Sequence, residues 1–325
     1  MAKRTRKKKS KFRKFLSFLL MVIFVAFVYK SFMTLDNQYL IERDNNNKIT
    51  LPPSLMVDIN ATISLPSDGL YSSNAILIQL NDHTILIQKK HEERIYPASL
   101  TKIMTAIVAI ENLTDLQEKI TLSNSMFQGL YDANAAIAGF QPDEQVKAID
   151  LLYGMLLPSG AECCIGLADQ IAGSEQNFVK MMIQKASKLG MDNTCFENVT
   201  GLHDESHYTT VKDLAILLSY ALQNDTFREI FTSSRHSTQP TNKHPDGITF
   251  YSTLFKKLQN PSVTNGEILG GKTGYTNEAA LCLASLAEIN GVEYVMVTAG
   301  AKGNNTTEQF NITDALAVYN SLGKK

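Results

Sequence analysis

Strand-like segments near both ends of the chain enclose a long series of helix-like segments, and this order constrains the fold more than any other feature. Two β-branched runs, residues 74–80 and 84–90, surround a short polar stretch and have the pattern of a hairpin. Residues 266–301 hold two further apolar runs around Asn290-Gly291, a dipeptide typical of tight hairpin turns. We therefore predict an α+β domain in which the terminal segments share one antiparallel sheet with flanking helices.

The segments between these strands have the apolar spacing of helices. We expect one helix that begins at the start of the apolar run 96–110 and another over residues 146–160. One or two further helices are expected within residues 161–191, one over residues 211–224 with Thr210 as a possible cap, and one at the C-terminus. The apolar faces of these segments predict a helical layer, or subdomain, beside the sheet.

The first 34 residues have the features of an uncleaved signal-anchor. Nine of the 31 lysines and arginines lie within residues 1–14, with no acid among them. A basic run alone could bind nucleic acid. The uncharged run that follows approaches the ~20 residues that span a bilayer, and no small-residue cleavage pattern comes after it. We therefore expect a cytoplasmic segment, 1–14, and a transmembrane segment, 15–34.

The remainder of the chain is then expected outside the cytoplasmic membrane. Residues 35–72 are rich in Asn, Asp, Pro and Ser and suit a linker, and residues 73–325 form the globular domain. A chain of 325 residues with 44% hydrophobic residues has enough material for a core of this size.

Cysteines and histidines give weak signals for disulfides or metals. The four cysteines are Cys163, Cys164, Cys195 and Cys282. Adjacent cysteines rarely bond each other, so buried thiols are favoured, and a pairing of Cys195 with Cys163 or Cys164 stays open. His203 and His207 are four residues apart, as in zinc peptidases, but Asp204 stands where those enzymes have Glu. We expect no metal and no cofactor.

Ser99 and Lys102 stand three residues apart at the start of the apolar run YPASLTKIMTAIVAI. In one interpretation, Ser99 is simply the N-cap of a helix and Lys102 points into solvent. If both side chains lie one turn apart on the same face, the amine can take the proton of the hydroxyl and activate it as a nucleophile.

Two further motifs favour the catalytic interpretation. Ser159 lies at a helix-breaking turn in PSGAECC, and GGKTGYT places Lys272, Thr273 and Gly274 on a predicted strand far downstream. S-x-x-K, a second serine motif and K-T-G in this order are the signature of penicillin-binding proteins and class A β-lactamases.

The chain resembles the serine D-alanyl-D-alanine carboxypeptidases, the low-molecular-weight penicillin-binding proteins, over roughly residues 70–320. The phrases PASLTKIMTA, FENVTGLHDESHYTTVKDLA and GGKTGYTNEAALCLASLA are similar to this family rather than to the β-lactamases. The resemblance implies a penicillin-binding-protein/β-lactamase-like (DD-peptidase) fold and an enzyme that removes the terminal D-alanine from peptidoglycan pentapeptide stems.

The resemblance also implies roles for the motif residues. Ser99 would attack the bond between two D-alanines and hold the acyl group as an ester. Lys102 would be its base, with a pKa lowered by burial and by the charge of Lys272, and Ser159 would relay a proton to the leaving group.

The K-T-G strand would then bind the substrate. Lys272 and Thr273 would hold its terminal carboxylate, and Gly274 would allow close approach. The backbone N–H groups of Ser99 and Tyr275 would form the oxyanion hole.

The second motif departs from the family pattern. The family usually has S-x-N, and here Ala161 occupies the asparagine position, with Glu162 next. Asparagine would bind the substrate amide and orient Lys102. Its loss could cost on the order of 1–3 kcal/mol, unless Glu162 or a water replaces it.

Two alternatives to a carboxypeptidase follow from these observations. Ala161 is compatible with a catalytically impaired wall-binding homologue. A β-lactamase would need a general-base glutamate, but no E-x-x-x-N of that kind lies between Ser159 and Lys272. We expect a single-pass protein of the bacterial cell membrane, with a cytoplasmic N-terminus, that is acylated by β-lactams and binds no nucleic acid.

Overall fold

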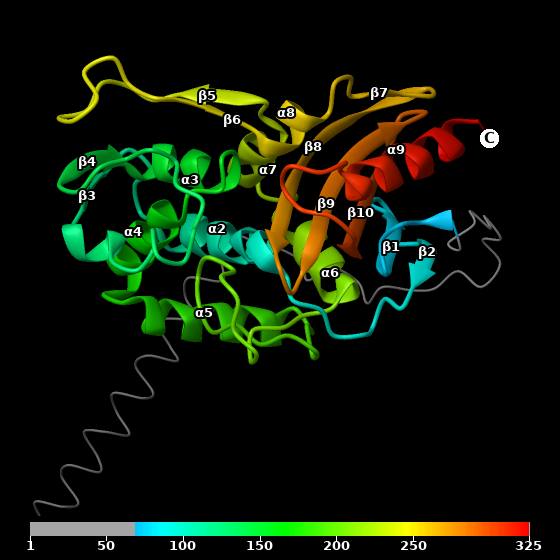
Figure 1. Ribbon diagram of the computed structural model, residues 1–325, viewed down its shortest axis with the longest axis horizontal. Coiled ribbons are helices and arrows are strands. Elements are labelled where there is room, and N and C mark those ends of the chain that lie inside the picture. The colour runs from blue at the N-terminus through cyan, green and yellow to red at the C-terminus, as the bar shows by residue number, and fades with distance from the viewer. Residues whose placement is uncertain (1–68, 325) are drawn as a thin grey trace, which may run out of the picture. The chain divides into compact units, whose positions relative to one another are not determined.

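A six-stranded antiparallel sheet joins the two ends of the domain (Figure 1). The computed structural model describes residues 69–324. The strand order is β2-β1-β10-β9-β8-β7. The strands are β1 (Asn74–Gln79), β2 (Ile85–Lys89), β7 (Ser262–Val263), β8 (Gly266–Thr276), β9 (Ala280–Ile289) and β10 (Val292–Ala301). Because β1 pairs with β10, the predicted sharing of one sheet by the terminal segments is confirmed.

Tight hairpins fix the register of this sheet. Asn290 (φ 53°) and Gly291 (φ 75°) both adopt the left-handed conformation between β9 and β10, as a two-residue hairpin requires. Val292 therefore pairs with Ile289 directly across the turn. The predicted hairpin of β1 and β2 is also present, with a register shift after Leu77.

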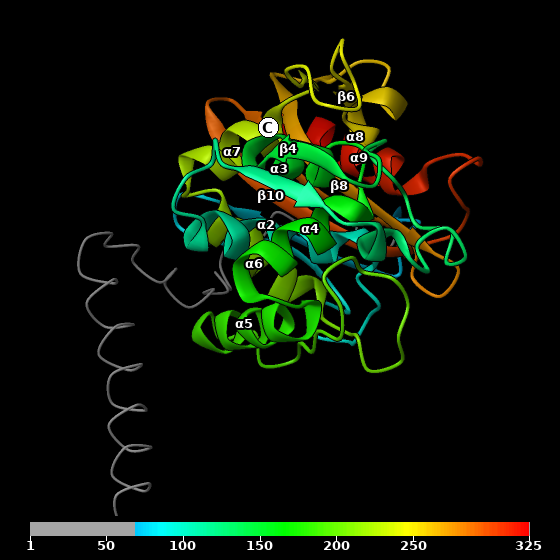
Figure 2. The ribbon, with the colours of Figure 1, turned by 90° about the vertical axis from the view of Figure 1, so that its left-hand side faces the viewer.

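Both faces of the sheet are covered, which explains why its central strands are apolar at nearly every position. Alternation along β1 sends Ile76 and Ile78 into a large core with the helical layer, and Leu77 into a smaller core beneath α9 (Phe310–Gly323). Figures 1 and 2 show α9 on one side of the sheet and α5 and α6 on the other.

The helical layer is built around a central buried helix, α2. Nine of its twelve residues are buried, so nearly all of its sides face the protein interior. The layer consists of η2 (Ala98–Leu100), α2 (Thr101–Asn112), η3 (Asn124–Phe127), α3 (Ala148–Leu156), α4 (Ala161–Ala172), α5 (Glu175–Lys188), α6 (Val211–Ala221) and α7 (Asp225–Thr232). Thr210 caps α6 by accepting the N–H of Asp213, as the sequence predicted.

Two small strand pairs were not predicted from the sequence. They are β3 (Lys119–Leu122) with β4 (Glu144–Lys147), and β5 (Arg235–Ser237) with β6 (Thr249–Tyr251), which precedes the short helix α8 (Thr253–Lys257). The loop between β5 and β6, residues 238–248, lies at the top of Figure 1. The buried Glu144 carboxylate of β4 anchors this loop through hydrogen bonds with Thr241 and His244. The predicted helix 146–160 begins later because β4 takes its first residues.

Three further expectations concern cysteines and the N-terminus. All four cysteines are free, and three are buried, so the open pairing of Cys195 with Cys163 or Cys164 is absent. The expected transmembrane segment, 15–34, and most of the linker lie outside the described residues. Within residues 69–324, no helix combines the length and apolarity needed to cross a membrane.

Asp314 attaches the segment that enters the sheet to α9. Its buried carboxylate accepts the backbone N–H of Tyr71 at 2.9 Å and of Ser72 at 2.8 Å. We expect Asp314→Ala to lower the free energy of unfolding by about 2–4 kcal/mol, since two charge-assisted hydrogen bonds are lost. Urea unfolding at neutral pH measures this change.

The matched control is Asp314→Asn, which keeps one acceptor and should fall between the wild type and the alanine variant. An alanine variant within about 0.5 kcal/mol of the wild type, the range of ordinary surface changes, would contradict this role.

Candidate active site

Four predicted side chains form one chain of hydrogen bonds. Lys102 Nζ donates to Ser99 Oγ at 3.1 Å, and Ser159 Oγ lies 2.9 Å from Ser99 Oγ. Lys272 Nζ donates to Ser159 Oγ at 3.0 Å. Residues from η2, α2, the turn before α4 and β8 therefore converge on two hydroxyl groups between two amines.

Ser99 stands before the helix rather than capping it. The N-cap of α2 is Leu100, with no side-chain capping bond, and Ser99 belongs to the preceding 3₁₀ turn. Ala98 begins this turn with φ of 47°, a left-handed conformation that costs energy for a residue other than glycine. This turn directs the Ser99 hydroxyl toward Lys102 and Ser159.

Gly201 allows this turn to exist. Its φ is 80°, and a side chain there would place Cβ 1.8 Å from the carbonyl oxygen of Ala98. Only glycine permits both the conformation and the approach. The loop after α5 therefore packs directly against the turn 98–100 that carries Ser99.

Lys102 lies in an environment that favours its neutral form. The residue is 3% exposed, and its amine also donates to the carbonyl oxygen of Thr200. Burial lowers the pKa of Lys102, and the nearby Glu162 and cysteines oppose this only in part. The sequence predicted a pKa lowered by burial and by the charge of Lys272; of these two causes, burial is the one that lowers the pKa of Lys102.

Lys272 is fully buried in the middle of β8. Burial is the main cause, and the positive charge of Lys102 the second, of a Lys272 pKa well below its ordinary value. Its amine also donates to the carbonyl of Thr273 at 3.0 Å. The two amines cannot readily both be charged, because like charges in a buried site repel each other.

The predicted binding strand, β8, passes close to Ser99. A Cβ at Gly274 would lie 3.1 Å from the carbonyl oxygen of Pro97 and 3.2 Å from the backbone nitrogen of Ser99, so Gly274 allows a tight approach. Tyr275 follows on the same strand, and the Thr273 hydroxyl lies 2.7 Å from that of Thr253. The backbones of Gly274 and Ser99 are thus side by side.

Ala161 and Glu162 do not take the place of an asparagine beside Lys102. Ala161 is buried at the start of α4, and its N–H donates to the carbonyl of Ala136. One oxygen of Glu162 accepts the N–H groups of Ala138 and Gly139, and burial raises the pKa of this carboxyl. Glu162 therefore holds the 138–139 backbone, and Lys102 receives its acceptor from Thr200.

His207 supports the turn 98–100 that carries Ser99, a structural role that the sequence did not suggest. Its Nδ1 accepts the N–H of Glu197 at 3.1 Å, which leaves Nε2 to donate to Thr101 Oγ1 at 2.9 Å. The Thr101 hydroxyl in turn donates to the Ala98 carbonyl at 2.9 Å. The ring is thus a buried, neutral link beneath Ser99.

The two histidines of HDESH face different neighbours. His203 packs edge-on against Tyr96, with ring centroids 4.7 Å apart, and its Nδ1 lies 3.9 Å from Glu278. In the part of the chain that the structure describes, no group of three or more His, Cys, Asp or Glu side chains could hold a metal ion.

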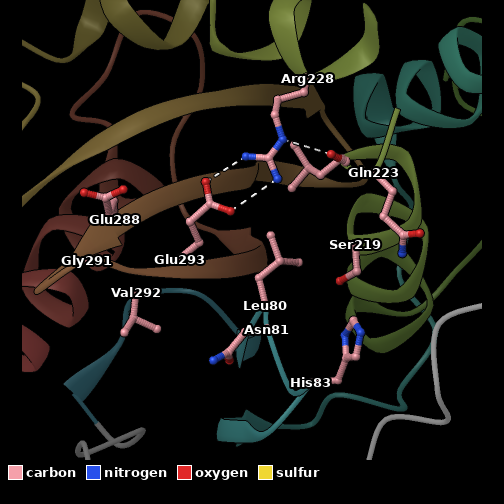
Figure 3. A pocket seen from close by; sticks show the side chains of 11 residues that line it. Leu80, Asn81, His83, Ser219, Gln223, Arg228, Glu288, Gly291, Val292 and Glu293 are labelled. Carbon is pink, nitrogen blue, oxygen red and sulfur yellow. Dashed lines mark hydrogen bonds and ion pairs between the residues drawn. The ribbon is translucent and has the colours of Figure 1, made fainter. Parts of the chain in front are cut away.

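A separate cavity of about 480 Å³ lies at the other end of the sheet, by the turn between β9 and β10 (Figure 3). Arg228 binds both carboxylate oxygens of Glu293, at 2.7 and 3.2 Å, and donates to the Leu222 carbonyl. The buried His83 lines the wall opposite. Gly274 pairs with Cys282 near the far end of β9, so this cavity is not part of the serine–lysine cluster.

Comparisons with known proteins agree with the geometry. Residues 61–303 match the model of the family described as D-alanyl-D-alanine carboxypeptidase, Peptidase_S11. The D-alanyl-D-alanine carboxypeptidase DacF of Bacillus subtilis is 32% identical over 234 residues, covering 71% of this chain and 57% of that protein. DacC of Escherichia coli is 31% identical over 259 residues, covering 75% and 60%. The chain thus spans somewhat over half the length of these relatives.

A solved structure is similar over most of the domain. The Streptomyces K15 DD-transpeptidase superposes with a TM-score of 0.70 and 25% identity, covering 78% of this chain and 97% of that one. The expected penicillin-binding-protein-like fold is therefore confirmed.

His207 should make stability depend on pH below neutrality. Burial lowers its pKa from 6.5 to about 4. Between these pH values the unfolded chain binds a proton at this position and the folded chain does not, so stability falls as the pH falls. We expect a loss of about 3 kcal/mol between pH 7 and pH 4 that is absent in His207→Gln.

Urea unfolding at several pH values gives the slope of the free energy of unfolding against pH for the wild type and for His207→Gln. Identical slopes for the wild type and His207→Gln would show that His207 takes up its proton without unfolding.

Proposed function

The chain belongs to the D-alanyl-D-alanine carboxypeptidase family, and from this premise we propose that it removes the terminal D-alanine from peptidoglycan pentapeptide stems. The observation that carries this proposal is the contact of Lys102 Nζ with Ser99 Oγ at 3.1 Å, within a buried cluster completed by Ser159 and Lys272. A nucleophile in contact with a neutral amine is the arrangement that acyl transfer requires.

In the proposed reaction Ser99 Oγ attacks the carbonyl carbon between the two D-alanines while its proton passes to Lys102. The carbonyl oxygen becomes an oxyanion that receives the N–H groups of Ser99 and Tyr275. When the carbon–nitrogen bond breaks, the departing D-alanine amine receives the proton held by Lys102, relayed through Ser159. Water then attacks the ester carbonyl while Lys102 accepts its proton, and Lys102 returns this proton to Ser99 Oγ as the ester C–O bond breaks.

The substrate is proposed to lie along β8. Residues 268–276 of β8 pair with β9 on one side, and β7 pairs only with residues 266–267 on the other. This open edge suits an extended peptide that adds as a further strand. Lys272 and Thr273 would bind the terminal carboxylate, and a β-lactam would occupy the same place and acylate Ser99.

Two observations favour this activity over the alternatives drawn from Ala161. Lys102 has its contact with Ser99 and an acceptor at Thr200 without any asparagine, so the base is in position. The related proteins are named carboxypeptidases. A disabled wall-binding protein or a β-lactamase has less support.

Release of D-alanine from diacetyl-lysyl-D-alanyl-D-alanine tests the proposal. We expect Ser99→Ala to lower the rate by at least about 10³-fold, and Lys102→Gln by about 10²- to 10⁴-fold, since nucleophile and base are removed. Each variant should keep the wild-type circular dichroism spectrum. Equal release by the wild type and Ser99→Ala would overturn the assignment of the nucleophile.

The dependence of kcat/KM on pH tests the role of Lys102. The active form of the base is the neutral amine, and burial lowers the pKa of Lys102 from 10.5. We therefore expect the rate to rise with pH and to reach half its maximum clearly below pH 10.5. A rise centred near 10.5 would mean that Lys102 is an ordinary solvated lysine during the reaction.

We further propose that residues 15–34 anchor the protein in the bacterial cell membrane, with residues 1–14 in the cytoplasm and the catalytic domain outside. The uncharged run and its basic flank support this orientation. Expression in a bacterium should place the full chain in the membrane fraction and a chain without residues 1–34 elsewhere. Sedimentation of both forms with the membrane would contradict the anchor.

A further inference from the structure

Glu278 occupies the tip of the hairpin between β8 and β9, just beyond the proposed substrate-binding strand. The turn is closed by the pairing of Thr276 with Ala280. The Glu278 side chain is 42% exposed, and among the described residues its one ion-pair partner is His203, at 3.9 Å. A contact this long leaves the carboxylate available for a closer cation.

The surroundings of Glu278 connect it to the turn 98–100 that carries Ser99. His203 packs against Tyr96, which precedes Pro97, and the Pro97 carbonyl lies beside Gly274. Glu278 is thus linked by these contacts to the segment that carries Ser99. It lies beyond the C-terminal end of β8, and Lys272 lies further back along the same strand.

The direction of the bound peptide places its preceding residue near this carboxylate. This step rests on the proposed function, with the terminal carboxylate at Lys272 and Thr273 and the reacting carbonyl at Tyr275. The rest of the peptide then runs antiparallel to β8, toward Thr276 and the hairpin tip. At about 3.4 Å per residue, the residue before D-alanyl-D-alanine lies opposite Thr276, within reach of Glu278 for a long side chain.

The other polar side chains at the tip are already engaged. Tyr275 Oη donates to Asn277 Oδ1 at 2.8 Å, and Thr276 Oγ1 accepts the N–H of Ala279 at 3.0 Å. The loop that carries His203 adds two further acids, Asp204 and the exposed Glu205, so its charge also favours a cation.

We propose that Glu278 is a specificity residue that favours peptides with a cationic side chain directly before the D-alanyl-D-alanine end. The free ε-amine of a lysine, or the amine of another diamino acid, would pair with the Glu278 carboxylate. A peptide whose amine is acetylated loses this contact and keeps all others.

The test compares kcat/KM for Nα-acetyl-lysyl-D-alanyl-D-alanine and for its diacetyl form, using the full chain. We expect the wild type to prefer the free amine about 2- to 5-fold, the range for a solvent-exposed ion pair. Glu278→Gln should abolish this preference and keep the rate on the diacetyl peptide, and Glu278→Lys should reverse it. Added salt should weaken the wild-type preference, because it screens exposed charges.

Glu267→Gln, an exposed acid at the other end of β8, is the matched control and should retain the preference. A preference unchanged in Glu278→Gln, or absent in the wild type, would overturn the proposal.

A second measurement separates this inference from the proposed function. Each peptide can protect Ser99 from acylation by a fluorescent penicillin, which reports binding without turnover. If neither peptide is hydrolysed, the carboxypeptidase function fails, and the ratio of the two protection constants still decides whether Glu278 selects the cation. Equal protection by both peptides would rule the selection out.

Discussion

The structure depends on the burial of two lysine amines around two serine hydroxyls. Removing an ammonium group from water is costly, so burial drives Lys102 and Lys272 toward their neutral forms. The carbonyl oxygens of Thr200 and Thr273 accept hydrogen bonds from these amines and reduce the cost of their burial. The same burial that makes the site costly to fold lowers the pKa of Lys102 and so makes its neutral, proton-accepting form more accessible.

The backbone around the cluster is arranged to keep this contact. Ala98 and Ser159 both have positive φ values, 47° and 76°, next to the Ser99 hydroxyl or at the Ser159 hydroxyl. Each such residue costs on the order of 1–3 kcal/mol and persists only where its surroundings require it. At Ala98, the backbone is held by the close approach of Gly201 and by the hydrogen bonds that join its carbonyl through Thr101 to His207.

The sequence predicted those parts of the fold and site that depend on the identity and spacing of particular side chains. The hairpin at Asn290-Gly291, the shared sheet and the meeting of Ser99 with Lys102 follow from spacing and turn chemistry. The Thr200 carbonyl could not be found in this way, because every residue carries the same backbone oxygen. His207 lies in a polar stretch whose letters resemble an exposed loop, and only the folded chain shows that its ring is buried. Strands of three or four residues, such as β3 and β5, are too short for a periodic signal.

Ala161 shows how the two kinds of reasoning differ. From the sequence, loss of an asparagine removes two contacts, one to the base and one to the substrate. In the structure Lys102 holds its position through Ser99 and Thr200, and Glu162 is occupied with the backbone at residues 138–139. In the proposed reaction, the cost of Ala161 therefore falls on the contact with the substrate amide, because the position of Lys102 does not depend on an asparagine.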